Sequence, residues 1–255
     1  MTSAATDSPL VDDLAAEQAV LDDLVSDLCE EQWATPTPAA GWKVRDQIAH
    51  LAFFDDVATV SLTGGGDARF AELYAAMGTG KPDFVRSPAG DRSDCEVLAR
   101  WRKVRATEEF AFRRIEPTSR VPWGPNKMAA QSLCTARLME TWAHGLDCFM
   151  ALGVAPVDTD RLRHVCHITY RAIPHALMQA GLTMPAPIDE LVVDVVSPSG
   201  ELWRFGREDA PNRIEGTAAE FARIGVRRMR LDDATTLQPN GPLAEVALPN
   251  LKAYL

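Results

Sequence analysis

The sequence lacks the features that mark several large classes of protein. No apolar run is long enough to span a bilayer, and residues 1–8 are polar, without the apolar core of a secretory signal. Positive charge is also scarce: 26 Lys and Arg stand against 36 Asp and Glu, for a formal net charge of −10. Nucleic-acid binding needs clustered Lys and Arg to displace phosphate counterions. We therefore expect a cytoplasmic protein that binds neither membranes nor nucleic acid.

Cysteine is sparse, and its spacing argues against a disulfide framework. The five cysteines are odd in number and widely spaced, and no two form a Cys-x-x-Cys pair: Cys29, Cys95, Cys134, Cys148 and Cys166. Reduced thiols are the simplest interpretation. Cys148 lies four residues after His144 and could face the same pocket, although a small core residue is the favoured role. Internal repeats, Gly-rich phosphate loops and nucleophile elbows are also missing.

Helical periodicity fills the first two thirds of the 255 residues. Apolar stripes and breakers predict four long helices, 10–28, 44–61, 93–115 and 128–152, and a short helix over 68–77. Loops are predicted over 78–90 and over 116–126, where there are three prolines. Ser93 followed by Glu96 is a capping-box signature, and Gly153 suits a helix C-terminus. The pattern is typical of an up-down four-helix bundle.

A fifth helix is expected over 160–180, with Pro174 kinking or interrupting it. His164, His167, Arg171 and His175 fall near one face of that helix. They could line a second metal site or an anion pocket. They could also form a solvated basic stripe, which is the favoured interpretation.

The pattern changes near Pro187, and the tail reads as a small α+β unit. We predict a hairpin of 191–196 with 202–205, an amphipathic helix over 216–230 and a short strand near 245–248. The predicted domains are therefore 1–182 and 183–255, in an α+β protein. Arg204 and Arg207 could offer positive charge to an anionic substrate, with ordinary surface arginines as the alternative.

His50, Glu140 and His144 are the candidate metal ligands. Glu140 and His144 are four residues apart, which places them on one face of a helix, one turn from each other. His50 could supply a third ligand from a facing helix, and such a set leaves coordination positions open for catalysis. A surface ion pair is the alternative, as is a core histidine that donates to Glu140 without a metal.

Two aspartates lie close to these ligands along the chain. Asp46, one turn before His50, could orient its imidazole or could simply favour the helix N-terminus. Asp147 lies three residues after His144 and could support the site or be purely structural. Zinc suits two imidazoles and a carboxylate best, while nickel or iron(II) would fit as well.

The motifs Gly41-Trp42-x-Val44-x-Asp46-x-x-x-His50-Leu51 and Glu140-x-x-x-His144-x-x-Asp147 resemble the two signatures of the DinB-like metal-binding bundles. The resemblance is to the actinobacterial mycothiol-dependent maleylpyruvate isomerase branch. It implies a DinB-like four-helix bundle with His50, Glu140 and His144 as the metal triad. It also implies a sterol-carrier-protein-like C-terminal domain and the use of mycothiol.

The candidate metal triad and this resemblance together predict a metal-dependent enzyme. The resemblance implies that it uses a low-molecular-weight thiol on a small, electrophilic and anionic molecule. In the isomerase that the motifs resemble, the thiol adds to a cis alkene, the new single bond rotates, and loss of the thiol leaves the trans isomer. The same apparatus could transfer the sulfur to an electrophile. A non-catalytic, stress-related metal-binding or ligand-binding protein and a metal-assisted hydrolase remain as alternatives.

Overall fold

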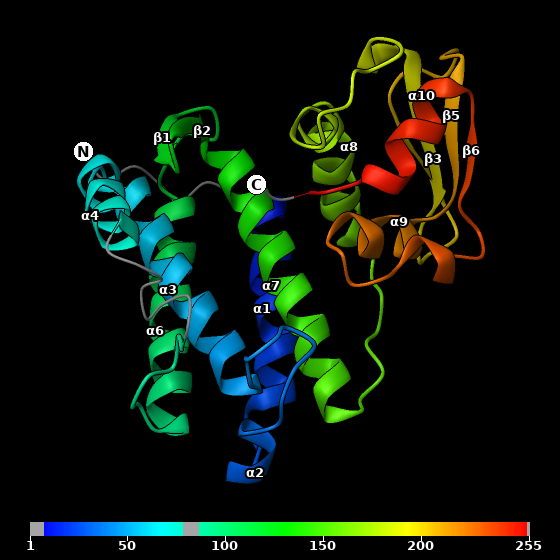
Figure 1. Ribbon diagram of the computed structural model, residues 1–255. Helices are drawn as coiled ribbons and strands as arrows, with labels where there is room; N and C mark the ends of the chain where they lie inside the picture. Colours follow the sequence, from blue (N-terminus) through cyan, green and yellow to red (C-terminus); the bar gives the residue numbers. More distant parts are fainter. Residues whose placement is uncertain (1–7, 79–86, 254–255) are drawn as a thin grey trace. The chain divides into compact units, whose positions relative to one another are not determined.

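The computed structural model describes residues 8–78 and 87–253. The chain divides into two compact units, Met1–Pro156 and Val157–Leu255. The first is helical apart from one small hairpin, and the second combines a sheet with helices (Figure 1). The expected α+β class is confirmed. Within the described residues, no helix combines the length and apolar character needed to cross a membrane.

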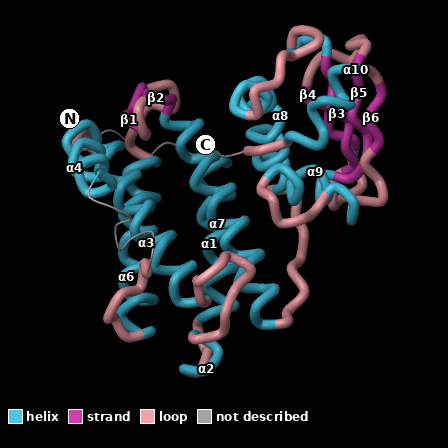
Figure 2. The backbone as a smooth tube through the Cα atoms, in the orientation of Figure 1, coloured by secondary structure: helices cyan, strands magenta, loops and turns pink. Residues whose placement is uncertain are grey.

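Four long helices form the body of the first unit, as predicted: α1 (Pro9–Val25), α3 (Val44–Leu62), α6 (Asp94–Phe112) and α7 (Ala130–Leu152). Helix α3 packs against both α6 and α7, and α1 packs mainly against α7 (Figure 2). A core between these helices includes the buried side chains of Leu21, Val25, Ile48, Leu51 and Trp101. Burying each such side chain contributes about 1.5–3 kcal/mol, so the stripes seen in the sequence hold the bundle together.

The ends of two helices follow the expected chemistry. The backbone N–H of Glu96 donates to Ser93 Oγ at 3.3 Å, and the Ser93 N–H donates to Glu96 Oε2 at 2.8 Å, which is the predicted capping box of α6. Helix α7 ends at Gly153, whose φ of 67° is in the left-handed region.

Shorter elements complete the first unit. Helices α2 (Glu30–Trp33) and α4 (Gly66–Gly78) precede and follow α3, and α4 confirms the short helix expected at 68–77. Most of the predicted loop over 78–90 lies outside the described residues. The loop predicted over 116–126 is wrong in part, because β1 (Arg120–Trp123) and β2 (Asn126–Ala129) pair as an antiparallel hairpin. Strands of four residues are too short to reveal alternation, and Pro122 argued against one.

The second unit is built on a four-stranded sheet in the order β4-β3-β5-β6. Strand β3 (Leu191–Val196) pairs antiparallel with β4 (Leu202–Phe205), as predicted, and parallel with β5 (Asn212–Thr217). Strand β6 (Gln238–Asn240) pairs antiparallel with β5. The remaining elements of this unit are α8 (Leu162–Gln179), α9 (Ala218–Gly225) and α10 (Pro242–Ala247), with short 3-10 turns at 188–190, 231–233 and 248–250.

The predicted boundary at 182/183 is wrong, because α8 belongs with the sheet. Helix α8 packs against α9 and β4, and a Cβ added at Gly225 would lie 2.3 Å from Thr169 Oγ1. This close packing places α8 in the core of the C-terminal unit. In the sequence, its helical pattern follows the patterns of the bundle helices without a visible change, so the pattern alone assigns it to the bundle. Pro174 lies inside α8 without ending it.

Two further expectations for the tail are corrected. The helix predicted over 216–230 is confined to α9, because Gly216 and Thr217 still belong to β5. The strand predicted near 245–248 is wrong, since those residues lie in α10 and the 3-10 turn after it. Pro242 at the first position of α10 is a common helix start, and the helix buries Leu243, Ala244 and Ala247.

Candidate metal centre

The three predicted ligands come together in the structure. One ligand atom from each of His50, Glu140 and His144 lies within 4.8 Å of the other two. His50 comes from α3, while Glu140 and His144 lie one turn apart on α7. In the part of the chain that the structure describes, no other group of three or more His, Cys, Asp or Glu is placed to share an ion.

Both ring nitrogens of His144 are within hydrogen-bond distance of a partner. Nε2 lies 3.1 Å from Glu140 Oε2, and Nδ1 lies 2.5 Å from Gln47 Oε1. Burial disfavours the charge on Glu140, but the hydrogen bond and charge of His144, with the charges of Arg137 and His50, outweigh it. They hold the pKa of Glu140 at about 2. The carboxylate is therefore ionised at neutral pH, as a metal ligand requires.

Aromatic rings surround the two imidazoles. The His50 ring centroid lies 4.6 Å from that of His144, 4.9 Å from that of Trp42 and 4.7 Å from that of Phe54. Trp42 also stacks on His144, with centroids 6.0 Å apart and an interplanar angle of 23°. Trp123, from the unpredicted hairpin, extends this wall by an edge contact with Phe54. The rings restrict the rotamers of the candidate ligands and shield them from water.

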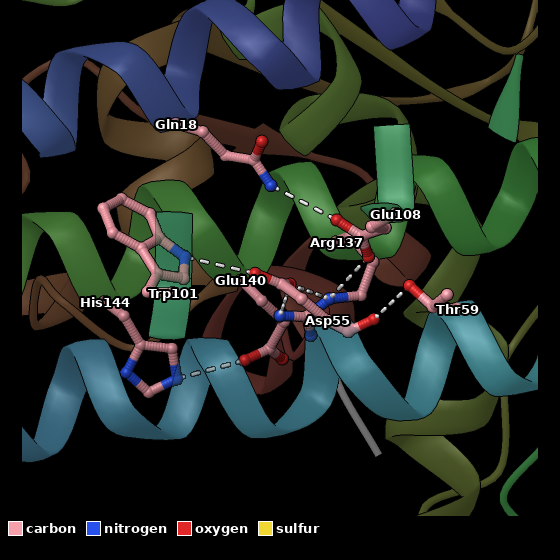
Figure 3. Close-up of polar contacts among 8 residues, drawn as sticks. All are labelled: Gln18, Asp55, Thr59, Trp101, Glu108, Arg137, Glu140 and His144. Carbon is pink, nitrogen blue, oxygen red and sulfur yellow. Dashed lines mark hydrogen bonds and ion pairs between the residues drawn. The ribbon is translucent and has the colours of Figure 1, made fainter. Parts of the chain in front are cut away.

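A buried polar network lies beside the candidate ligands (Figure 3). Arg137, one turn before Glu140 on α7, donates from Nε and Nη2 to Asp55 Oδ1 at 3.0 and 2.7 Å. Trp101 Nε1 donates to Asp55 Oδ2 at 3.2 Å. Arg137 also lies 3.7 Å from Glu108 Oε1. The network links α3, α6 and α7 beside the candidate site, and none of its members stood out in the sequence.

Glu108 is the least favourably placed carboxyl of this network. Burial and the nearby charge of Asp55 raise its pKa well above the ordinary value, against the opposing charge of Arg137. Gln18 Nε2 donates to Glu108 Oε2 at 3.2 Å. Burial also raises the pKa of Asp55, against the charge and hydrogen bonds of Arg137. One guanidinium therefore faces two buried carboxyls, of which Glu108 has the stronger tendency to keep its proton.

The two predicted supporting aspartates differ in what they contact. Asp46 Oδ2 accepts from the Lys43 N–H at 3.1 Å, and Asp46 Oδ1 accepts from the Ala89 N–H at 3.3 Å. These contacts favour its role at the N-terminus of α3 over the orientation of His50. Asp147 is buried on α7. Gln47, three residues before His50, lies within hydrogen-bond distance of the candidate ligand His144, and it did not stand out in the sequence.

The other candidate residues have partners of their own. Arg204 donates to both oxygens of Asp194, at 2.8 and 3.2 Å, and Arg207 donates to both oxygens of Asp209, at 3.0 and 2.9 Å. Both arginines therefore fit the alternative of ordinary surface residues better than that of a free anion-binding site. Cys148 is fully buried in the bundle core, and burial raises the pKa of its thiol, which agrees with the core role favoured for it.

The histidines of α8 form no metal cluster with a third ligand among the described residues. His167 is exposed and lies against the Phe205 ring, with centroids 6.2 Å apart. Partial burial lowers its pKa, and the charges of Arg171 and His164 lower it further. The arrangement agrees with the basic stripe rather than with a second metal site.

The donor set fits a divalent metal with nitrogen and oxygen ligands. Tetrahedral zinc with ligands at about 2.0–2.2 Å brings those ligands to roughly 3.4 Å from one another. His144 Nε2 and Glu140 Oε2 are already 3.1 Å apart, and His50 lies within the same 4.8 Å group. Two imidazoles and an ionised carboxylate would leave at least one position for another ligand.

Comparison with known proteins agrees with the two sequence motifs. The model of the mycothiol maleylpyruvate isomerase N-terminal domain matches residues 14–149, more than half of the chain and inclusive of all three candidate ligands. Two proteins from two strains of Mycobacterium tuberculosis, both described as uncharacterized, are each 39% identical over 226 residues. The similarity covers 88% of this chain and 86% of each relative.

Solved structures support the fold over nearly the whole chain. The crystal structure of the mycothiol-dependent maleylpyruvate isomerase superposes with a TM-score of 0.57, and that of a mutant of it with 0.56. Each is 16% identical and covers 94% of this chain and 98% of its own. At 16% identity the similarity to the solved structures shows the fold alone. Membership of a family is shown by the match to the domain over residues 14–149. This chain therefore belongs to the family that carries the mycothiol maleylpyruvate isomerase N-terminal domain.

Proposed function

We propose that this protein is a metal-dependent enzyme that uses a low-molecular-weight thiol, mycothiol, on a small electrophilic organic molecule. The reaction is either isomerisation of an activated alkene or transfer of the thiol sulfur to the electrophile. The observation that carries the proposal is the convergence of His50, Glu140 and His144 within 4.8 Å on two packed helices. Family membership supports the choice of thiol.

His50, Glu140 and His144 would hold the metal, with zinc preferred and nickel or iron(II) as alternatives. A divalent metal there would supply Lewis acidity that lowers the pKa of a bound thiol, so that the nucleophilic thiolate exists at neutral pH. The chain's own contribution is positional and electrostatic. Glu140 supplies a permanent negative charge, and Trp42 and Phe54 restrict the imidazoles and exclude water on their side.

The substrate is proposed only as a class. The superposed structures are those of a mycothiol-dependent maleylpyruvate isomerase, but a likeness at 16% identity does not transfer the electrophile. Arg204 and Arg207, expected as anion-binding residues, are paired with carboxylates of their own unit. We therefore propose a small electrophile without assigning maleylpyruvate, and a cytoplasmic location where reduced thiols are available.

Thiol-dependent turnover is the direct test. Metal-loaded protein should accelerate the reaction of mycothiol with at least one member of a panel of activated cis alkenes and alkylating electrophiles near pH 7. His144→Ala should abolish that rate, while His164→Ala, which removes a histidine outside the site, should leave it unchanged. Turnover that does not need the thiol would indicate a hydrolase. Metal binding without turnover of any member would indicate a non-catalytic binding protein.

Cobalt gives a spectroscopic companion to this test. Titration of mycothiol into the cobalt-substituted protein should produce a sulfur-to-metal charge-transfer band in the near ultraviolet, because the thiol would enter the open position. His164→Ala should give the same band. An unchanged spectrum at saturating thiol would contradict direct ligation of the thiol.

A further inference from the structure

Gln47 is fully buried on α3 and lies between a loop hydroxyl and a candidate metal ligand. Its Nε2 donates to Thr37 Oγ1 at 2.7 Å, and its Oε1 lies 2.5 Å from His144 Nδ1. The two ends of an amide differ, because one donates and the other accepts. Which end faces His144 therefore decides which nitrogen of His144 carries a proton.

The loop before α3 determines the orientation of that amide. Thr37 Oγ1 donates its single hydrogen to the backbone carbonyl oxygen of Trp42 at 3.0 Å. The same carbonyl accepts from the Thr37 N–H at 2.8 Å, so the hydroxyl has a fixed acceptor. Thr37 Oγ1 can then only accept from Gln47, which places the amide nitrogen of Gln47 toward Thr37 and the amide oxygen toward His144.

An oxygen facing His144 Nδ1 requires a proton on that nitrogen. With Nδ1 protonated, Nε2 is the nitrogen that a metal can bind, in place of the proton through which Nε2 bonds to the Glu140 carboxylate. Nε2 is the nitrogen that lies 3.1 Å from Glu140 Oε2, inside the candidate ligand group. The hydrogen-bond chain from the Trp42 carbonyl to Thr37, Gln47 and His144 therefore directs Nε2 to the place where a metal would bind.

We propose that Gln47, oriented by Thr37, is a positioning residue that keeps His144 in the Nδ1–H tautomer and presents Nε2 as the ligand. The proposal rests on the proposed function, since it assigns the metal to the His50, Glu140 and His144 group. The loop is well suited to the task. Residues 36 and 43 pair as an isolated antiparallel bridge, and the Val44 N–H donates to the Thr35 carbonyl oxygen at 3.0 Å.

The same loop also contributes Trp42, whose ring stacks on His144 and touches His50. The loop of residues 37–42 thus determines which nitrogen of His144 carries a proton, and its Trp42 ring packs against both His144 and His50. Loss of the Thr37 hydroxyl should therefore affect the metal site through Gln47, to which that hydroxyl is hydrogen-bonded.

The test combines metal affinity with the tautomer of His144. Gln47→Met removes the acceptor with little change of volume, and Thr37→Val removes the hydroxyl while the backbone hydrogen bond of residue 37 to Trp42 can persist. Thr37→Ser keeps the hydroxyl and is the matched control. Zinc affinity is measured by competition with a chromophoric chelator, and the histidine nitrogens are assigned by long-range proton–nitrogen spectra of the zinc-loaded and zinc-free proteins.

In the wild type and in Thr37→Ser, the His144 Nδ1 hydrogen should be protected from exchange, with or without zinc. Zinc affinity should fall by about 10- to 100-fold in Gln47→Met, the range typical of partners that orient a metal ligand. Thr37→Val should also lower zinc affinity, because without the hydroxyl the Gln47 amide is free to turn its nitrogen toward His144.

Two results would overturn the proposal. One is a wild-type His144 whose Nδ1 carries no protected proton. The other is a folded Thr37→Val and a folded Gln47→Met that both bind zinc as tightly as the wild type. A wild type that binds no zinc but keeps the protected Nδ1 hydrogen, lost in Gln47→Met, would instead refute the metal assignment and support the tautomer lock.

Discussion

Arg137 and Asp55 form a salt bridge of 2.7 Å with both side chains almost entirely removed from solvent, 2% and 0% exposed. Arg137 lies one turn from Glu140, and its positive charge helps to lower the pKa of that carboxyl. The pair therefore connects the stability of the bundle with the charge of the candidate metal site.

Removal of the guanidinium should strongly destabilise the protein. Arg137→Met would leave Asp55 buried without its charged partner, which costs about 3–5 kcal/mol of unfolding free energy. Urea unfolding of the metal-free protein measures the change. Arg102→Ala breaks the more exposed pair of Arg102 with Asp22 and serves as the control, with an expected loss within about 1 kcal/mol. Equal losses in the two variants would contradict a special role for the buried pair.

Glu108 should make the protein less stable as pH rises. Its pKa is raised in the folded state by burial and by the charge of Asp55, so the folded state holds a proton that the unfolded state has released. Stability then falls as pH rises from the unfolded value, about 4.3, toward the raised folded value. Glu108→Gln removes this titration while an amide oxygen can still accept from Gln18.

The measurement is the free energy of unfolding of both proteins at several pH values between 4.5 and 8. The free energy of unfolding of Glu108→Gln should increase relative to that of the wild type as pH rises. A constant difference across that range would mean that Glu108 ionises in the folded protein much as it does in the unfolded chain.

Glu140→Gln should weaken metal binding without unfolding the bundle. The substitution keeps the size of the side chain and removes the negative charge, so we expect lower affinity together with loss of the thiol-dependent rate. Because the pKa of Glu140 is about 2, the wild-type carboxylate remains charged from pH 5 to 8. Affinity should still rise with pH in that range, since imidazole ligands must lose a proton to bind. Chelator competition at three pH values tests both statements, and affinity in Glu140→Gln equal to that of the wild type would remove Glu140 from the site.

The juxtaposition of His50, Glu140 and His144 could be predicted from helix geometry together with the motif resemblance. A spacing of four places Glu140 and His144 on one helix face, while the choice of His50 as their partner came from the resemblance, and the structure shows that α3 packs against α7. Gln47 was within reach of the same argument, since it lies three residues before His50 on the same helix. Its contact with His144, and its orientation by Thr37, depend on a loop conformation that periodicity does not describe.

The buried network shows a different limit. Asp55, Glu108 and Arg137 read as ordinary charged positions of amphipathic helices, because a charge in a helical pattern is usually assigned to solvent. Only the three-dimensional packing shows that they face one another. The misplaced boundary has a similar cause: α8 is as helical as the bundle, and its attachment to the sheet depends on contacts such as Thr169 with Gly225.

Metal content is the measurement that tests the central claim most directly. Protein purified without chelators and analysed for zinc, nickel and iron should contain about one equivalent of divalent metal per chain. His144→Ala should lose most of it, while His164→Ala should retain it. Wild-type protein that remains metal-free after exposure to these ions, or a folded His144→Ala with unchanged metal content, would contradict the assignment of His50, Glu140 and His144 as a metal centre.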